Sequence, residues 1–529
     1  MPQVTSDTRA RAEDFPIREL LTAGAFHHPI TKIELRETHI SWIVLTGTFA
    51  YKIKKAVKFD FIDALSLERR RVLCEEDLRL NRRLAPELYL DVVAIVRTSG
   101  GLLVGGDGPA IEYAVRMRQF PASEELPTLL AAADINDVEM EALGELLALF
   151  HLDAAVATPV RAPEKTEQMY QSVFGNLAQL LSHFHGEHAA ALSHLIDWTH
   201  DTAQALERVF EMRERDGFVR ECHGDLHAAN IVRLQGQLIP FDCIEFDPRL
   251  RWIDVMNDVA FLVMDLASHD RSDLALVLLS RYLEVTGDYE AVLLLPFYAA
   301  YRALVRAKVD ALAAEQVPAR AAAYRDRLQR RIRAALEWAT PRRPMLILMH
   351  GASGSGKSWL SRQLVPELRA IRIRSDLERK RMAGMQPTQS EPAGVREGIY
   401  SPHFSHRTYA RLADHTEACL RAGFDVIVDA AFLDVTNREL FRALAKRVGV
   451  GHVIVACQAA PATLAERLIE RSAGHSDPSD ATLPVLDTQL REIKPFELAE
   501  QQDVVTVDTK EPDALRRTAA AVRRRSAAA

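Results

Sequence analysis

The first part of the chain alternates short apolar runs with one long amphipathic segment. Residues 41–45 and 49–54 are strand-like runs on either side of Gly47, a pattern that predicts a β-hairpin. Residues 66–84 have the spacing of a helix that ends before Pro86. The other elements expected here are a helix and a lead-in strand over residues 15–38 and further strands over residues 92–116. This part therefore predicts a small lobe rich in strands.

From about residue 117 to residue 338 the spacing is mostly helical. Three short strand-like runs interrupt it, at residues 218–219, 231–234 and 238–241, and they leave the polar residues between them in loops. One expected helix, over residues 135–152, carries His151 on an apolar face, where a histidine is more often part of the core than a ligand. The sequence T-P-R-R-P at residues 340–344 breaks the helical run and predicts a linker.

After the linker, apolar strands alternate with helical segments. The strands are expected at residues 345–350, 370–374, 425–429, 452–456 and 504–507. This alternation predicts a parallel sheet with helices on both faces. We therefore expect two domains of α/β and α+β class, residues 1–339 and 345–515, and a basic tail over residues 516–529. The arginines of that tail are expected at the frayed, solvated end of a helix rather than on nucleic acid.

Composition supports a globular protein and narrows the function classes. The chain has 529 residues, more than one hydrophobic core usually supports. Its net charge of −7 argues against a protein that coats nucleic acid, although the C-terminal half retains room for a local basic patch. The five cysteines are scattered and never spaced as C-x-x-C, which indicates reduced thiols without a zinc site. No secretory signal and no apolar run of about 20 residues is found, so a cytoplasmic protein without a membrane partner is expected.

A polar stretch in the first half carries candidate chemistry. Residues 221–230 read E-C-H-G-D-L-H-A-A-N, and Asp242 follows twelve residues later. Transfer of a phosphoryl group from a metal-bound nucleotide needs a base, an amide ligand to the metal and a second carboxylate. Asp225 fits the base, and Asn230 and Asp242 fit the magnesium ligands. The stretch resembles the catalytic loop of the aminoglycoside phosphotransferase and choline kinase-like branch of the protein-kinase-like fold, H-G-D-x-x-x-x-N. The resemblance implies a bilobal domain, with a small lobe at residues 15–116 and a large lobe at 117–339.

A strand lysine should reach the nucleotide phosphates in such a domain. Lys52 and Lys54 lie two residues apart on one face of the hairpin, so periodicity leaves both open. The run around Lys52 resembles the family's strand and favours Lys52. Glu76, on the expected inner face of the helix over residues 66–84, is predicted to pair with this lysine, and Glu75 is the alternative. Residues 37–41 lack the glycine flap of protein kinases, which is often missing in this branch too.

Two further acids follow the catalytic loop. Asp254 and Asp258 are four residues apart, which places them on one face of a helix. Similar acids in the resembled family brace the catalytic loop, and this role is implied for both.

The second half carries a Walker A motif. Residues 351–358 read G-A-S-G-S-G-K-S between an apolar strand and a helix, which is the setting that the motif requires. Its members are Gly351, Ala352, Ser353, Gly354, Ser355, Gly356, Lys357 and Ser358. The glycines allow main-chain N–H groups to face phosphates, Lys357 is expected at the β- and γ-phosphates, and Ser358 at Mg²⁺. Asp429, at the end of a strand, is placed for the Walker B role on the metal.

This half resembles the P-loop kinases of the gluconate kinase, polynucleotide kinase and zeta-toxin-like group. The resemblance implies Asp376 as the base for the acceptor. It also implies Arg467 and Arg471 as lid arginines that neutralise the transferring phosphoryl group, whereas a solvated arginine face is the alternative from spacing alone.

The sequence as a whole predicts an ATP- and Mg²⁺-dependent phosphotransferase with a second, P-loop ATP site. Its paired arrangement resembles bacterial proteins described as bifunctional aminoglycoside phosphotransferase and AAA-type ATP-binding protein. The expected partner is a small-molecule hydroxyl acceptor, which no residue identifies. Two alternatives remain at this point: a nucleotide-gated interaction protein, and a C-terminal half that is a polynucleotide or nucleotide kinase.

Overall fold

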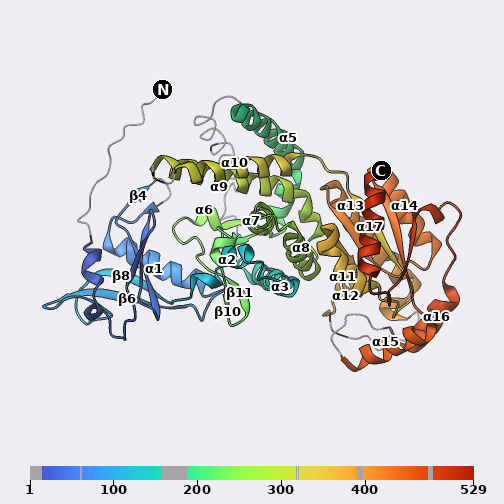
Figure 1. The fold of residues 1–529 in the computed structure, drawn as a ribbon, viewed down its shortest axis with the longest axis horizontal. Coiled ribbons are helices and arrows are strands. Elements are labelled where there is room, and N and C mark those ends of the chain that lie inside the picture. The colour runs from blue at the N-terminus through green and yellow to red at the C-terminus, as the bar shows by residue number, and fades with distance from the viewer. Residues whose placement is uncertain are drawn as a thin grey trace. The chain divides into compact units, whose positions relative to one another are not determined.

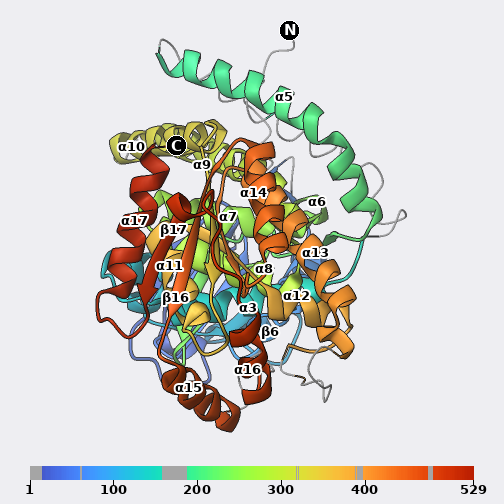
Figure 2. The same cartoon turned by 90° about the vertical axis from the view of Figure 1, so that its right-hand side faces the viewer.

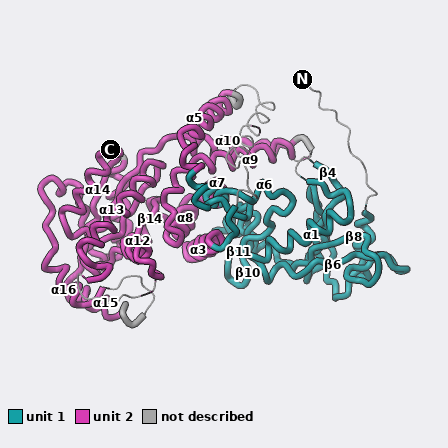
Figure 3. Tube along the Cα trace, turned by 180° about the vertical axis from the view of Figure 1, so that it is seen from behind, with its two compact units in different colours: residues 1–135, 153–165, 212–258 teal, residues 136–152, 166–211, 259–529 magenta. Residues whose placement is uncertain are grey.

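The computed structural model describes residues 15–59, 62–157, 175, 187–316, 319, 321–387, 389, 397–474 and 481–528. Over these residues, none of the helices is both long and apolar enough to cross a membrane. Contacts divide the chain into two compact units (Figure 3). Unit 1 contains residues 1–135, 153–165 and 212–258, and unit 2 contains residues 136–152, 166–211 and 259–529. The predicted domain boundary at 340–344 stays a prediction, because the units group residues by contact and place residues 259–339 with the C-terminal sheet.

Unit 1 is built on a six-stranded antiparallel sheet with the order β1-β2-β3-β8-β6-β7. Its strands are β1 (Glu34–Glu37), β2 (Ser41–Leu45), β3 (Phe49–Lys54), β6 (Tyr89–Thr98), β7 (Gly101–Val104) and β8 (Ala110–Arg118). Helix α1 (Leu67–Asn81) begins at Ser66, whose Oγ accepts a hydrogen bond from the Arg69 N–H, and it packs on β3, β6 and β8 (Figure 1). The predicted hairpin and helix are confirmed.

The N-terminal segment of this unit differs from the expectation. Instead of one helix, it contains two short 3₁₀ helices, η1 (Ile17–Leu20) and η2 (Ala23–Ala25). The two are separated by Thr22 in an extended conformation, and Gly24 adds a residue with a poor helix propensity. The segment is therefore too interrupted to sustain a regular helix.

Unit 1 also contains small elements, several of which flank the catalytic loop. They are β4 (Lys58–Phe59), β5 (Ile62–Asp63), η3 (Ala122–Glu124), α2 (Leu126–Ala131), β9 (Val219–Glu221), η4 (Ala228–Asn230), β10 (Ile231–Leu234), β11 (Gln237–Pro240), α6 (Pro248–Arg251) and β12 (Trp252–Asp254). β10 and β11 form a hairpin, and β12 pairs antiparallel with β9. The loop of residues 222–230 thus leaves one two-stranded ladder and enters another.

Helices dominate the first part of unit 2. They are α3 (Asp137–Asp153), α5 (Glu187–Arg215), α7 (Val255–Ser268), α8 (Ser272–Thr286), η5 (Tyr289–Leu294), α9 (Leu295–Gln316) and α10 (Ala321–Ala339), with the last turn of α5 and the first of α7 counted in unit 1. α9 and α10 pack along each other. His151 on α3 is buried, and its Nδ1 lies 3.0 Å from the Tyr282 hydroxyl, so the predicted core histidine is confirmed.

The rest of unit 2 is a five-stranded parallel sheet with the order β14-β15-β13-β16-β17. Its strands are β13 (Met345–His350), β14 (Ala370–Arg374), β15 (Asp425–Asp429), β16 (Gly451–Gln458) and β17 (Val504–Asp508). Helices α11 (Lys357–Leu368) and α17 (Ala514–Ala528) cover one face, and α13 (Pro402–Arg421) and α14 (Val435–Val448) cover the other (Figure 2). The remaining elements are α12 (Ser375–Met382), η7 (Gly398–Tyr400), α15 (Pro461–Gly474), α16 (Leu483–Glu492) and η8 (Gln501–Asp503). The predicted parallel sheet, covered on both faces, is confirmed.

Two smaller expectations can be settled. Residues 516–528 form the end of a helix, α17, and Arg516, Arg517, Arg523 and Arg524 are exposed to solvent, as expected. This end is not frayed, because α17 buries Thr518, Ala519 and Val522 against the sheet. All five cysteines are buried and unpaired with one another, as predicted.

Candidate functional site

The predicted catalytic loop brings Asp225 and Asn230 together. The Nδ2 of Asn230 donates to the Oδ2 and to the main-chain oxygen of Asp225, both at 3.0 Å. The Nε2 of His227 lies 3.3 Å from the same Oδ2. The Asp225 side chain is 36% exposed, whereas Asn230 is buried. A carboxylate that is fixed by an amide and still accessible to solvent is the geometry that a general base needs.

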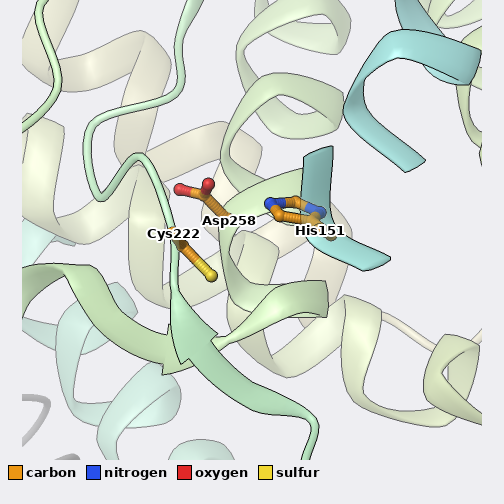
Figure 4. Close-up of side chains that lie close together, drawn as sticks. All are labelled: His151, Cys222 and Asp258. Atoms are coloured by element: carbon orange, nitrogen blue, oxygen red, sulfur yellow. The ribbon is translucent and has the colours of Figure 1, made fainter. Parts of the chain in front are cut away.

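Asp258, in the first turn of α7, holds the backbone of this loop. Its two carboxylate oxygens accept hydrogen bonds of 2.9 Å from the N–H groups of His223 and Gly224. Figure 4 shows Asp258 on its helix beside Cys222, the residue before His223. Gly224 has a φ of 87°, and a Cβ there would lie 2.8 Å from the Leu250 oxygen, so the turn requires glycine. The predicted bracing role is confirmed for Asp258.

Asp254 does not share that role, which corrects the prediction. It is the last residue of β12, and its carboxylate pairs with Arg213 through contacts of 2.6 and 2.9 Å. The Asp254 Oδ1 also accepts a hydrogen bond of 2.8 Å from the Met256 N–H, at the start of α7. Because the helix begins only after Asp254, the spacing of four does not place both acids on one helical face. Asp254 anchors the end of α5 instead.

The loop after β11 places Asp242 against Lys52. Asp242 has a φ of 66°, a left-handed conformation that is uncommon outside glycine. Its N–H donates to the Tyr89 hydroxyl at 3.1 Å, and the next N–H, of Cys243, donates to Asn81 Oδ1 at 2.8 Å. The amine of Lys52 donates to Asp242 Oδ1. Residues from β6 and α1 therefore fix the backbone that presents this carboxylate to β3.

The pair Lys52–Asp242 is linked to the catalytic loop through the main chain. The Phe241 N–H donates to the Asn230 oxygen at 2.9 Å. The Phe241 oxygen lies 2.9 Å from Nε2 of His223. Burial lowers the pKa of His223, which Asp258 and Asp225 oppose without cancelling it. The His223 imidazole thus connects the two halves of the candidate site.

Both candidate lysines contact one buried acid, Asp77. The Asp77 Oδ2 lies 2.8 Å from the Lys52 amine and 2.6 Å from the Lys54 amine. Lys54 also pairs with Glu245 at 2.5 Å. Burial alone would lower the pKa of each lysine, but the acids outweigh it and both pKa values are raised. Lys52 differs from Lys54 in reaching Asp242, which keeps it as the predicted phosphate ligand.

The prediction that Glu76 or Glu75 pairs with the strand lysine is wrong. Glu76 binds Arg79 and Arg251, each at 2.7 Å, and the Glu75 side chain is 55% exposed. The buried residues of α1 are Arg70, Cys74, Asp77, Leu80 and Asn81. The leucine spacing predicted an inner face centred one residue before the observed one. The helix turns Asp77 toward β3 because two buried ammonium groups, those of Lys52 and Lys54, need an acid as partner. Asp77 was missed for this reason, and no motif marks Glu245, the second acid that pairs with Lys54.

The Walker A residues form a loop between β13 and α11. Gly351, Gly354 and Gly356 have φ values of 141°, 81° and 87°. A Cβ on Gly351 would lie 2.5 Å from the Cys457 oxygen, so the loop packs too closely for other residues. Such a loop presents main-chain N–H groups to an anion at the N-terminus of the next helix. Lys357 Nζ donates to the Ala352 oxygen at 2.9 Å, which holds it over the loop.

Ser358 and Asp429 meet at the carboxyl end of the sheet. The Ser358 Oγ donates to Asp429 Oδ1 at 3.3 Å, and the Ser361 Oγ donates to Oδ2 at 3.0 Å. A hydroxyl and a carboxylate are the hard oxygen donors that Mg²⁺ prefers, so the pair fits this metal. Asp376 lies in the first turn of α12, after β14, and is partly buried. In the part of the chain that the structure describes it makes no hydrogen bond to the Walker A loop, and its role stays a prediction.

Two side chains from later helices reach the Walker A loop. Arg467 on α15 donates to the Gly354 oxygen at 3.1 Å and to Thr509 Oγ1 at 3.0 Å, so it is not on a solvated face. Gln489 on α16 accepts a hydrogen bond of 2.8 Å from the Ser353 N–H. Gln489 was missed because no motif marks it. The side chain of Arg471 lies outside the described residues.

The AAA domain family model matches residues 346–496, the region that holds the Walker A loop, Asp429 and Arg467. Two uncharacterized mycobacterial proteins, Mb2027c of Mycobacterium bovis and Rv2004c of Mycobacterium tuberculosis, are each 32% identical to this chain over 459 residues. The match covers 85% of this chain and 89% of each relative. The chain belongs to the family of these mycobacterial proteins.

Solved kinases show more distant likenesses. The match to a choline kinase from Cryptosporidium parvum covers 58% of this chain and 88% of the choline kinase chain, with 11% identity and a TM-score of 0.37. The match to a gluconokinase from Sinorhizobium meliloti covers 35% of this chain and 96% of the gluconokinase chain, with 22% identity and a TM-score of 0.27. At these TM-scores neither likeness decides the activity.

Proposed function

We propose that this chain is an ATP-dependent phosphotransferase with two nucleotide sites, one in unit 1 and one at the Walker A loop of unit 2. Both sites would transfer the γ-phosphoryl group to a hydroxyl group of a small molecule. The observation that carries the proposal is in unit 1. There, residues separated by up to 190 positions in the chain form two hydrogen-bonded pairs, Asp225–Asn230 and Lys52–Asp242.

The pair Asp225–Asn230 would supply the general base, and the pair Lys52–Asp242 would bind the phosphates and the metal. Asp225 would accept the proton of the acceptor hydroxyl while the hydroxyl oxygen bonds to the γ-phosphorus of ATP. The bond between the γ-phosphorus and the β–γ bridging oxygen would break at the same time, and ADP would leave with that electron pair. Lys52 would bind the α- and β-phosphates. Asn230 and Asp242 would hold Mg²⁺, which supplies charge neutralisation when bound. Asp77 is placed to orient Lys52, because it contacts the amine at 2.8 Å.

The second site would work with different parts. The Walker A N–H groups and Lys357 would cradle the phosphates, and Ser358 with Asp429 would hold Mg²⁺. Arg467, which contacts the loop at Gly354, would neutralise charge on the phosphoryl group. Asp376 would be the base for the acceptor. The family-model match over residues 346–496 supports nucleotide binding here and leaves the acceptor open.

The test uses the full chain, γ-labelled ATP with Mg²⁺, and pooled sugars, nucleosides and amino alcohols as acceptors. Asp225→Asn preserves the side-chain volume but removes the base, so products of the first site should fall by about 10²–10⁴-fold. Lys357→Ala should abolish the products of the second site and spare those of the first. Asp216→Asn changes an exposed acid that pairs with its neighbour Arg215, and it is the matched control.

The outcomes separate phosphoryl transfer from mere nucleotide gating. Two sets of labelled products, one lost in Asp225→Asn and the other lost in Lys357→Ala, support two transferase sites. Transfer that is unchanged in both Asp225→Asn and Lys357→Ala would refute the proposal. Transfer to a 5′-hydroxyl oligonucleotide that depends on Lys357 would make the second site a polynucleotide kinase.

A further inference from the structure

The edge strand of the parallel sheet carries two arginines beside the candidate metal site. Arg372 and Arg374 alternate on β14, so they share one face of the strand. Arg372 is 8% exposed at its side chain and Arg374 is 12% exposed. The Nε of Arg374 lies 3.9 Å from Asp429 Oδ2, and Asp429 also raises the pKa of Arg372. Two guanidinium groups therefore lie close to the carboxylate that would hold Mg²⁺.

An acid on α8 offsets the charge of one of these two arginines, Arg372. Glu284, near the end of α8, pairs with Arg372 at 2.8 Å, and its side chain is only 2% exposed. Burial alone would raise the pKa of the Glu284 carboxyl, but Arg372 and Arg374 outweigh it and the pKa is lowered. Glu284 is thus a buried anion held between the edge strand and its own helix. It lies well before residues 346–496, which the AAA domain family model matches.

The contact continues from Arg372 to the Walker A motif. The Nη1 of Arg372 donates to the main-chain oxygen of Ser358 at 3.4 Å. The backbone of Arg372 is fixed from the same side, because its N–H donates to Ser280 Oγ at 2.9 Å and its oxygen accepts a hydrogen bond of 3.4 Å from the Tyr289 hydroxyl. α8 and η5 thereby satisfy polar groups of an edge strand that would otherwise be open.

We propose that Glu284 is a positioning residue for the metal-binding end of the P-loop site, acting through Arg372. It fixes the Arg372 guanidinium group on the Ser358 backbone and offsets the positive charge of that group, one of the two near Asp429. The inference rests on the proposed function, since it takes Ser358 and Asp429 as the Mg²⁺ ligands. It adds that this site is incomplete without α8, a helix that precedes residues 346–496.

Removing the charge of Glu284 should weaken Mg²⁺ binding without weakening the binding of free nucleotide. Glu284→Gln keeps the shape of the side chain and its acceptor oxygen but removes the negative charge. The Mg²⁺ concentration for half-maximal binding of a fluorescent ADP analogue should then rise about tenfold, at the low end of what outer-shell substitutions cost a metal site. Binding of the same analogue without Mg²⁺ should stay equal or become tighter, because an uncompensated guanidinium attracts an anion. A general loosening of the fold would weaken both.

Two further variants keep the test decisive. Asp310→Asn removes another buried acid of unit 2 that binds Arg327 and Arg331 at 2.9 and 3.0 Å in the α9–α10 pair, and it should leave the Mg²⁺ dependence unchanged. The double variant Glu284→Gln/Arg372→Met removes both charges, and replacing a buried pair by apolar groups is often neutral for folding. It should restore the Mg²⁺ dependence to within about threefold of wild type, and this comparison holds even where the single variant folds poorly.

Subtracting the binding that persists in Lys357→Ala isolates the P-loop site. A folded Glu284→Gln variant with wild-type Mg²⁺ dependence, or a double variant that remains as impaired as the single one, would overturn the inference alone. A wild-type protein that binds no nucleotide in a Lys357-dependent manner would overturn the proposed P-loop function and the inference with it.

Discussion

The buried charge cluster of unit 1 gives a sharp prediction, because it contrasts two adjacent acids. Asp77→Asn removes the carboxylate that contacts both Lys52 and Lys54, whereas Glu76→Gln changes the neighbouring acid, which binds Arg79 and Arg251. Asp77 is fully buried, and Glu76 is 25% exposed. Both changes replace a carboxylate by the amide of the same shape, but they act on opposite environments, the buried lysines and the partly exposed arginines.

The distances set the size of the expected effect. At 2.6–2.8 Å and an effective dielectric constant of about 20, each Lys–Asp77 contact is worth about 6 kcal/mol before desolvation is subtracted. Breaking a buried pair typically costs about 3–5 kcal/mol. The lower value, about 3 kcal/mol, applies here, because Lys52 keeps Asp242 and Lys54 keeps Glu245. Glu76→Gln should cost about 1 kcal/mol or less, since its partners are partly solvated or have another acid.

Hydrogen–deuterium exchange over β3 and α1 measures this locally, without assuming that the whole chain unfolds in one step. Asp77→Asn should speed exchange there roughly 100-fold, and Glu76→Gln less than about tenfold. The double variant Asp77→Asn/Lys54→Met also removes one of the two lysines that lose Asp77, and it should recover part of the protection from exchange. Equal effects of the two single variants, or a double variant less protected than Asp77→Asn, would show that the lysines do not depend on Asp77.

Two other predictions concern unit 2. Gly354→Ala should weaken Lys357-dependent nucleotide binding by about tenfold or more, because Gly354 has a φ of 81° and its Cβ would lie 2.6 Å from the Leu464 oxygen; unchanged binding would contradict the close packing. His350 is buried, its Nε2 has no hydrogen-bond partner among the described residues, and burial lowers its pKa to about 4. The unfolded chain then binds more protons than the folded chain between pH 6.5 and 4. The free energy of unfolding should therefore decrease as the pH is lowered through that window, by up to about 1.4 kcal/mol per pH unit. His350→Phe should flatten this fall in thermal unfolding measured at pH 6.5 and 4.5, and an unaltered slope would assign it to other groups.

Local motifs could be predicted because their residues are close in sequence. The Walker A loop and its flanking strand and helix occupy one short stretch, and the H-G-D loop needs Gly224 for its turn. The parallel sheet was predictable for the same reason, since β13, β15 and β16 each contain a continuous apolar run and helical segments separate the strands. The bracing role of Asp258 was implied by the resemblance, because similar acids follow the catalytic loop in the resembled family.

Long-range pairings were not predictable, because they depend on which side chain another element buries. The inner face of α1 follows from Lys52 and Lys54 on β3, not from its leucines, so Glu76 was chosen in place of Asp77. Glu284 and Arg372 are 88 positions apart, and neither belongs to a motif. The alternation of Arg372 and Arg374 in a buried strand was the available signal, because a buried arginine requires an acid.

The number of nucleotides bound per chain tests the central claim most directly. Equilibrium dialysis of the full chain against a labelled, non-hydrolysable ATP analogue with Mg²⁺ should give two molecules per chain. Lys357→Ala and Asp242→Ala should each leave about one, and the two changes together should leave none. A wild-type value of one that Lys357→Ala abolishes and Asp242→Ala does not affect would contradict a nucleotide site in unit 1.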